Sequence, residues 1–146
     1  TVGADGHVYA FDIQAAALES TAQHLPQAGC PENYTLIHDS HHHAKNYIPG
    51  KIKAGKFNLG WLPGSGNRTV TTKRETTLSA VRDAIDMMDS DAIILVAVYP
   101  GHEEGTKEGE ALAEMLSHYD RRQYSVSQFR LLNSPTSPYF MIVENR

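Results

Sequence analysis

Short apolar segments alternate with amphipathic segments along most of this 146-residue chain, and this alternation limits its fold more than any other feature. Strand-like runs lie at 7–12, 34–40, 54–60 and 92–100, and helix-like runs lie at 13–25, 74–90 and 107–120, with a shorter helix and loop within 41–53. Such alternation is typical of an α/β fold in which a mostly parallel sheet carries helices on both faces.

The end of the chain departs from this alternation. Two further strand-like segments, 124–133 and 139–145, are joined only by the short "SPTSP" stretch. A parallel crossover needs a connection of helix length, so these two strands must pair as an antiparallel hairpin. A chain of this length fits one domain, and we therefore predict a single α/β domain over residues 1–146.

The apolar positions also predict which side chains form the core. Pro26 and Gly29 are expected to end the first helix. The inward faces of the two later helices comprise Leu78, Val81, Ala84, Ile85 and Met88, and then Ala111, Leu112, Met115 and Leu116. Ordinary core positions are also expected for Met87, Met88, Phe129 and Phe140.

Composition excludes several classes of protein. No run approaches the roughly 18 apolar residues of a membrane span, and no charged-then-apolar signal segment opens the chain. The single Cys30 excludes an internal disulfide and fits a reducing, cytoplasmic location. The net charge of −4 argues against a general nucleic-acid coat. The oligomeric state stays open, a homodimer included.

Charge is unevenly distributed along the chain. The stretch from Ala44 to Arg74 holds seven basic residues and no Asp or Glu, while the rest of the chain has 6 basic and 17 acidic residues. A positive segment in an acidic protein indicates an anionic partner held at one place. A solvated, lysine-rich loop explains the charge equally well.

Polar residues follow the first strand-like run, where open α/β sheets bind their ligands. Asp12 ends this strand and Gln14 follows it closely. A carboxylate at this position can hold the two hydroxyls of an adenosine ribose. Asp12 also stands just before a helix, where it can serve as the N-cap, and the two roles can coexist.

The second strand-like run ends in "HDSH", which contains Asp39, Ser40 and His41. Asp39 could accept a hydrogen bond from the exocyclic amine of adenine, or Asp39 or Ser40 could cap the next helix. Four histidines stand here, but adjacent side chains diverge and no further Cys or His stands at ligand spacing, so we predict no metal site. His41 is the histidine most suited to line a pocket.

The third and fourth strand-like runs end at Asn58 and at Tyr99, with His102 shortly afterwards. If these strands are neighbours, the three side chains face one crevice. Asn58 could align a nucleophilic amine through its side-chain carbonyl. His102 could accept a proton near neutral pH, although a single histidine in a loop is more often simply exposed.

Together, "FDIQ", "LIHDSH", "FNLGWLPG" and "VYPGH" resemble the YtqB/MnmM-like rRNA methylase family of S-adenosylmethionine-dependent tRNA wobble-uridine methyltransferases. The resemblance covers nearly the whole chain and implies a Rossmann-like methyltransferase fold, whose last strand inserts antiparallel. It implies methyl transfer from S-adenosyl-L-methionine to the amine of 5-aminomethyl-(2-thio)uridine in the tRNA anticodon loop.

The resemblance also implies roles for individual residues. Asp12 and Gln14 match its ribose-side motif, and Asp39 and Ser40 match its adenine-side motif. The stretch from Asn58 to Gly64 matches the loop at the methyl-transfer crevice, with Asn58 near both cofactor and substrate, and Tyr99 to His102 match the facing wall. The catalytic candidates are thus Asn58, His102 and Tyr99.

RNA contacts are expected on the stretch after Asn58. Trp61 can stack on a flipped base or anchor its own loop, and Arg68, Lys73 and Arg74 can contact phosphates, with His41 nearby. Two alternatives stay open: an NAD(P)-dependent oxidoreductase, which also places an acid on a ribose, and a non-catalytic RNA- or nucleotide-binding protein.

One departure from the family pattern concerns the start of the chain. Such methyltransferases carry a first strand, a Gly-rich loop and a helix before the ribose-binding strand. Here "TVGADGH" leads straight into "VYAFD". The comparison with the family therefore predicts an N-terminally truncated domain without that central strand.

Overall fold

A computed structural model describes residues 2–3, 5–58, 74–101 and 103–146. Its elements, in chain order, are β1 (Val8–Asp12), α1 (Ala15–Gln27), β2 (Tyr34–His38), η1 (His41–Asn46, a 3₁₀ helix), β3 (Ile52–Asn58), α2 (Arg74–Asp86), β4 (Met88–Val98), α3 (Glu103–Ser117), β5 (Tyr124–Phe129) and β6 (Tyr139–Asn145). Their order confirms the predicted alternation and its hairpin ending.

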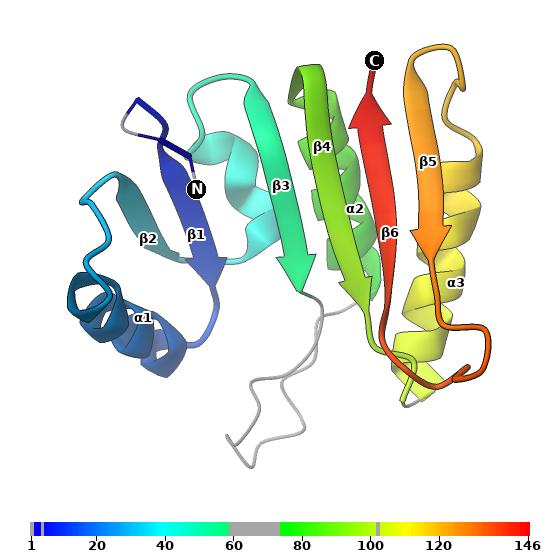
Figure 1. Cartoon of the computed structure of the whole chain (residues 1–146), viewed down its shortest axis with the longest axis horizontal. Coiled ribbons are helices and arrows are strands. Elements are labelled where there is room, and N and C mark those ends of the chain that lie inside the picture. Colours follow the sequence, from blue (N-terminus) through cyan, green and yellow to red (C-terminus); the bar gives the residue numbers. More distant parts are fainter. Residues whose placement is uncertain (1, 4, 59–73, 102) are drawn as a thin grey trace.

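The larger sheet contains four strands in the order β3-β4-β6-β5 (Figure 1). β3 pairs with β4 in parallel, whereas β6 pairs antiparallel with both β4 and β5. β6 therefore inserts between β4 and β5, as the comparison with methyltransferases predicts.

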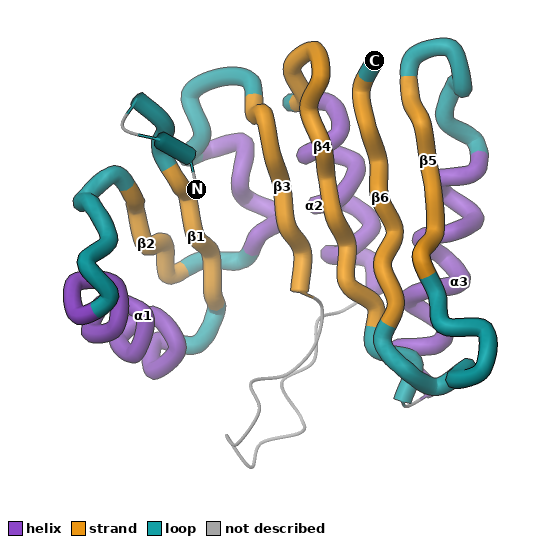
Figure 2. Tube along the Cα trace, viewed as in Figure 1, coloured by secondary structure: helices purple, strands orange, loops and turns teal. Residues whose placement is uncertain are grey.

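The two N-terminal strands form a separate parallel pair, β1-β2. The described strands thus make two sheets, with β1 and β3 facing each other but not hydrogen-bonded (Figure 2). The N-terminal truncation predicted from the comparison with the family stays a prediction.

Helices α2 and α3 cover one face of the four-stranded sheet. In Figure 1 the crossover from β1 to β2 runs in the opposite direction to the crossover from β3 to β4 in the other sheet. Because such crossovers are right-handed, α1 lies on the opposite face from α2.

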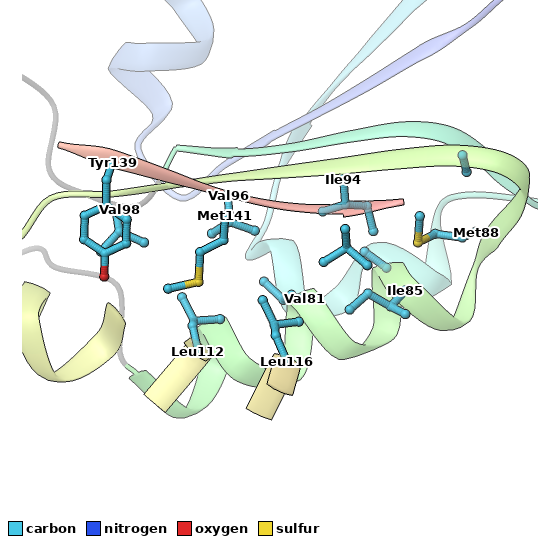
Figure 3. Close-up of a cluster of buried hydrophobic side chains, with 13 residues drawn as sticks. Val81, Ile85, Met88, Ile94, Val96, Val98, Leu112, Leu116, Tyr139 and Met141 are labelled. Atoms are coloured by element: carbon cyan, nitrogen blue, oxygen red, sulfur yellow. The ribbon is translucent and has the colours of Figure 1, made fainter. Parts of the chain in front are cut away.

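One hydrophobic core fills the space between the four-stranded sheet and its two helices (Figure 3). Ile94, Val96 and Val98 of β4 point into it, because alternate strand residues share a face. The predicted helix faces are confirmed: Val81 and Ile85 of α2, and Leu112 and Leu116 of α3, are at most 1% exposed. The packing of these helices fixes the positions of β3 and β4, whose ends carry candidate site residues.

Pro26 does not end the first helix as predicted, because α1 continues to Gln27 with Pro26 inside its last turn. Its missing N–H removes one helical hydrogen bond only, at an end that frays in any case. Gly29 does end the helix, with a positive φ of 67°. The amide of Cys30 then donates to the carbonyl oxygen of Leu25, which completes a glycine-terminated helix end.

The strand expected from Ala92 begins earlier, at Met88. Its first residues pair with β3 through an irregular register, in which Ile52 lies opposite Met88 and Ala54 opposite Ile93. Asp91 takes up the extra residues with a φ of 55°, an uncommon value outside glycine. The apolar pattern could not reveal this bulge because it falls on polar residues.

The expected core position of two aromatic residues is wrong. Phe129 is 64% exposed and Phe140 is 37% exposed. They lie opposite each other on β5 and β6, and Phe140 stands between the core residues Tyr139 and Met141, so both rings lie on the sheet face away from the core. Met88 is buried as expected, whereas Met87 is only partly buried.

Candidate functional site

The carboxyl ends of β1, β3 and β4 point the same way (Figure 1). Asp12 ends β1, Asp39 directly follows β2, Asn58 ends β3 and Tyr99 directly follows β4. The fold therefore places these four predicted residues at one edge, where open α/β sheets bind ligands.

Asp12 is partly buried and holds the turn into α1. Its Oδ1 accepts a 2.8 Å hydrogen bond from the backbone amide of Gln14. The N-cap position of α1 belongs to Gln14, whose side chain makes no capping bond, so the cap expected at Asp12 lies two residues later. Oδ2 of Asp12 has no described partner and is available to a ligand.

The strand ends carrying the two acids are adjacent. Asp12 lies opposite His38 in the β1-β2 register, and Asp39 is the next residue. The imidazole of His38 donates from Nε2 to the carbonyl oxygen of Ile13 over 3.1 Å. This bond connects the two loops in which a ribose-binding and an adenine-binding acid are predicted.

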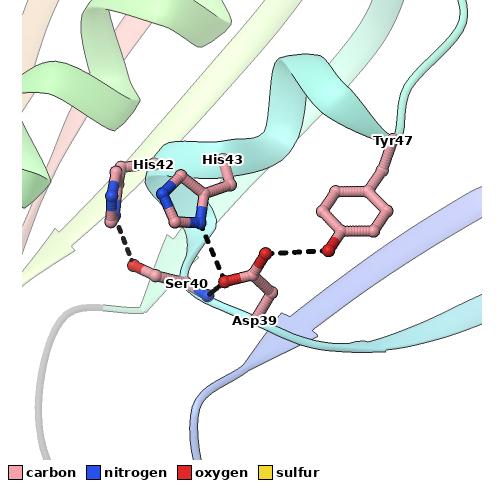
Figure 4. Close-up of polar contacts among 5 residues, drawn as sticks. All are labelled: Asp39, Ser40, His42, His43 and Tyr47. Atoms are coloured by element: carbon pink, nitrogen blue, oxygen red, sulfur yellow. Dashed lines mark hydrogen bonds and ion pairs between the residues drawn. The ribbon is translucent and has the colours of Figure 1, made fainter.

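Asp39 accepts three hydrogen bonds (Figure 4). Its Oδ1 accepts from the backbone amide of Ser40 at 2.7 Å and from Nδ1 of His43 at 2.8 Å. Its Oδ2 accepts from the hydroxyl of Tyr47 at 2.8 Å. These bonds, His43 first, lower the pKa of Asp39 to about 2, so the side chain is an ionised acceptor at neutral pH.

Ser40 occupies the N-cap position of η1 but its side chain makes no capping bond there. Its hydroxyl instead lies 2.7 Å from Nδ1 of His42. The rings of His42 and His43 are 3.8 Å apart. The histidines after β2 thus organise the Asp39 loop.

Asn58 and Tyr99 meet across the ends of β3 and β4. The Tyr99 hydroxyl donates a 2.8 Å hydrogen bond to Oδ1 of Asn58. Both side chains are exposed, and Asn58 lies opposite Ala97 in the parallel register. The adjacency predicted for Asn58 and Tyr99 is confirmed, and the bond from Tyr99 orients the Asn58 amide.

His41 lies on the core side of this region. Its ring packs edge-on against Phe57 of β3, with centroids 5.9 Å apart, and its Nε2 is buried without a described partner. Burial lowers the pKa of His41, and the charge of His42 lowers it further, so the ring is neutral near pH 7. Its predicted contact with substrate stays a prediction.

Comparison with known families decides the identity. Residues 8–145 match the model of the family described as "Putative rRNA methylase". The chain belongs to this rRNA methylase family. The sequence resemblance is thereby confirmed.

A curated relative, the chloroplastic tRNA (mnm(5)s(2)U34)-methyltransferase of Arabidopsis thaliana, is 34% identical over all of this chain. The chain spans 55% of that relative's length.

Two solved structures show the same architecture. The crystal structure of a "putative rRNA-methylase" from Clostridium thermocellum has a TM-score of 0.92 and 33% identity, and the alignment covers 99% of this chain and 77% of that one. A "putative methyltransferase" from Streptococcus mutans in complex with SAH has a TM-score of 0.86 and 32% identity, covering 96% and 76%. These matches confirm the Rossmann-like methyltransferase fold.

Several predicted site residues lie outside the described residues: Trp61, Arg68, Lys73 and His102. Arg74 begins α2, directly after them. Their proposed contacts with RNA, and proton acceptance by His102, stay predictions.

Three lysines of the basic segment have local partners. Lys45 contacts Asp83 at 2.6 Å and Asp86 at 3.3 Å, and the bond to Asp83 is the main cause of its raised pKa. Lys53 contacts Asp89 at 3.1 Å, and Lys51 donates to the carbonyl oxygen of Asp86. These acids lie outside the basic segment in the sequence, so counting charges within the segment could not include them. The positive charge of the segment is therefore weaker evidence for an anionic partner than the sequence indicated.

Sequence analysis missed His43 and Tyr47, the two side chains that hold Asp39. They stand four and eight residues after it. A helical spacing from Asp39 would have indicated His43, but the turn that brings Tyr47 back to the carboxylate has no sequence signature.

Among the described residues, no group of three or more His, Cys, Asp and Glu is arranged to hold a metal ion. Nor is any described helix long and apolar enough to cross a membrane.

Proposed function

We propose that this member of the family transfers a methyl group from S-adenosyl-L-methionine to the amine of 5-aminomethyl-(2-thio)uridine at the wobble position of tRNA. The observation that carries the proposal is the shared edge at which β1 and β3 end in Asp12 and Asn58, while Asp39 and Tyr99 directly follow β2 and β4. Family membership favours this activity over an oxidoreductase or a non-catalytic binding protein. The name of the Arabidopsis relative supports the substrate.

The two acids fit the adenosine part of this cofactor. Asp12 keeps Oδ2 open beside the β1 end and suits the ribose hydroxyls, with Gln14 beside it. Asp39 lies on the neighbouring loop with Ser40, and its side chain is 28% exposed and ionised, so it can accept from the adenine amine. When bound, the cofactor supplies an electrophilic methyl group on sulfur, which the substrate amine takes as the carbon–sulfur bond breaks.

Asn58 orients the substrate amine in this proposal. A carbonyl oxygen has two lone pairs, and that of Asn58 accepts only one described hydrogen bond, from Tyr99. The second lone pair can accept from the amine and direct the nitrogen lone pair towards the methyl group. The amine must be neutral to react, and His102 is the proposed acceptor of the proton released afterwards.

Replacing Asn58 tests this role. Asn58→Ala leaves both acids in place, so S-adenosylmethionine should bind as before while methyl transfer falls by about 100-fold, on the order expected when a positioning contact is lost. The measurement is single-turnover methylation of tRNA carrying 5-aminomethyluridine, with cofactor affinity measured in parallel. Asn46→Ala, at an exposed position in η1, is the matched control. A near-normal rate in Asn58→Ala would remove Asn58 from the mechanism.

Recognition of tRNA would use the residues after Asn58. Trp61 would stack on the target base, and Arg68, Lys73 and Arg74 would contact phosphates. Neutralising Lys73 and Arg74 together should flatten the dependence of log affinity on log salt by roughly 0.7–0.9 per lost phosphate contact. Neutralising Lys45 and Lys53, which have acidic partners, should leave that slope unchanged. Equal slopes in both double variants would contradict the assignment.

A further inference from the structure

We infer that His43 and Tyr47 are positioning residues that leave Asp39 one open acceptor site, and that this makes the loop selective for a purine carrying an amino group. The inference rests on the proposed function, because it concerns the adenine end of the cofactor.

A carboxylate has about four sites at which it can accept hydrogen bonds. The described donors fill three of them on Asp39: Ser40 and His43 on Oδ1, and Tyr47 on Oδ2. The remaining site is the second one on Oδ2. The side chain is still 28% exposed, so a ligand can reach it.

Neighbouring contacts hold both donors in place. The Tyr47 ring packs edge-on against Phe11 of β1, with centroids 5.7 Å apart, directly before Asp12. The His43 ring lies against His42, whose Nδ1 is 2.7 Å from the Ser40 hydroxyl. The Asp39 carboxylate therefore cannot rotate without breaking bonds to two anchored rings.

Asp12 provides the contrast within the same site. Its carboxylate accepts one described hydrogen bond, on Oδ1, and Oδ2 is unoccupied by any described residue. Such a group can accept from two ligand hydroxyls, as a ribose requires. Asp39, with one site left, matches a single N–H donor.

A single fixed acceptor distinguishes an amino group from a keto group. The amine of adenine donates a hydrogen bond to the open site. The keto oxygen of hypoxanthine would face the ionised carboxylate without a proton between them, which leaves both groups unpaired and costs binding. Rotation of the carboxylate would relieve this contact, and His43 and Tyr47 prevent rotation.

The test compares S-adenosylhomocysteine with S-inosylhomocysteine, in which a keto oxygen replaces the amine on C6 and the neighbouring N1 carries a hydrogen. Titration calorimetry on the unaltered protein should show a preference of roughly 10-fold or more for the adenine form, the effect of one unmet hydrogen bond to a charged group. Tyr47→Phe and His43→Leu should each reduce the preference several-fold. His43→Asn, which keeps an N–H donor near the position of Nδ1, should retain most of it.

Tyr9→Phe is the matched control, because Tyr9 lies on β1 and has a ring contact with His7 rather than with Asp39. It should leave the preference unchanged. A purely structural role would weaken both ligands equally and leave their ratio constant, and that result in folded Tyr47→Phe and His43→Leu would overturn this inference alone. Absence of S-adenosylhomocysteine binding by the unaltered protein would instead overturn the proposed function and this inference with it.

Discussion

The β1-β2 unit with α1 and the four-stranded unit with α2 and α3 differ sharply in packing. The four-stranded unit contains all thirteen residues of the buried hydrophobic cluster. In β1, α1 and β2, only Ile37 is buried, at 6% exposure, and α1 has no buried residue. Stability therefore resides in one unit, whereas both proposed cofactor-binding acids belong to the other.

The contact between the units is polar as well as apolar, and it is made by η1, which follows β2. η1 packs against α2 of the four-stranded unit. Within this contact His41 lies on Phe57 of β3, and Lys45 pairs with Asp83 and Asp86. Exposed ion pairs contribute little to stability. The β1-β2 unit is thus expected to open more readily than the four-stranded unit, and a ligand held by Asp12 and Asp39 should stabilise it.

The largest expected effect tests where stability resides. Leu112 is fully buried in the core, so Leu112→Ala should lower the free energy of unfolding by about 2–5 kcal/mol. Leu132 is 99% exposed, and Leu132→Ala should change it by less than about 0.5 kcal/mol. Urea denaturation measures both variants. A small loss in Leu112→Ala would mean that the described core does not dominate stability.

Amide hydrogen exchange tests the difference between units directly. Amides in β1 and β2 should exchange at least roughly tenfold faster than those in β4 and β6, because local opening needs little apolar surface to be exposed. Saturating S-adenosylhomocysteine should slow exchange mainly in β1, β2 and the Asp39 loop. Equal protection in both units without ligand would contradict the comparison.

Most of the fold was predictable because the spacing of apolar residues along the chain indicates which side chains are buried. The alternation fixed the order of elements, and the short "SPTSP" link required the antiparallel hairpin formed by β5 and β6. Phe129 and Phe140 were wrongly placed in the core because an apolar side chain on a strand does not reveal whether another element covers its face. Pro26 was misjudged because proline is tolerated in a last helical turn.

The candidate site was predictable only in part. Strand ends indicated Asp12, Asp39, Asn58 and Tyr99, since parallel strands bring their carboxyl ends to one edge. The Tyr99–Asn58 bond confirms one such pairing. Long-range partners such as Lys45 with Asp83 carry no sequence signal, because they depend on how η1 packs on α2.

A smaller effect is expected for Asp12, and it distinguishes cofactor binding from the rate of methyl transfer. Asp12 lies in the weakly packed unit and Asn58 in the stable one. Asp12→Ala should weaken S-adenosylmethionine binding by about 1–3 kcal/mol, the cost of unmet hydrogen-bond partners, with little change in the rate at saturating cofactor. Asp12→Asn, which keeps Oδ1 as an acceptor for the Gln14 amide, separates loss of the turn from loss of the charge. Unchanged affinity in folded Asp12→Ala would exclude the ribose role.

The smallest expected effect is a titration within the Asp39 loop. Three hydrogen bonds lower the pKa of Asp39 to about 2 in the folded protein, against an ordinary value of 3.8. Because the folded value is the lower one, the stability that Asp39 contributes is fully present above about pH 3.8 and is lost as the pH falls through 2. Removing one of the hydrogen-bond donors should raise the pKa of Asp39 in the folded protein.

Tyr47→Phe removes the hydroxyl bound to Oδ2 and leaves the His43 and Ser40 bonds to Oδ1. The Asp39 carboxyl resonance, followed by ¹³C NMR, should then titrate at a higher pH than in the unaltered protein, between 2 and 3.8. His43→Leu should raise the midpoint further, because the bond from His43 is the largest cause of the lowered pKa. The Asp89 carboxyl, which lies in the four-stranded unit and pairs with Lys53, should titrate identically in all three proteins. An unchanged Asp39 midpoint in both variants would show that this loop of the β1-β2 unit is not held by His43 and Tyr47.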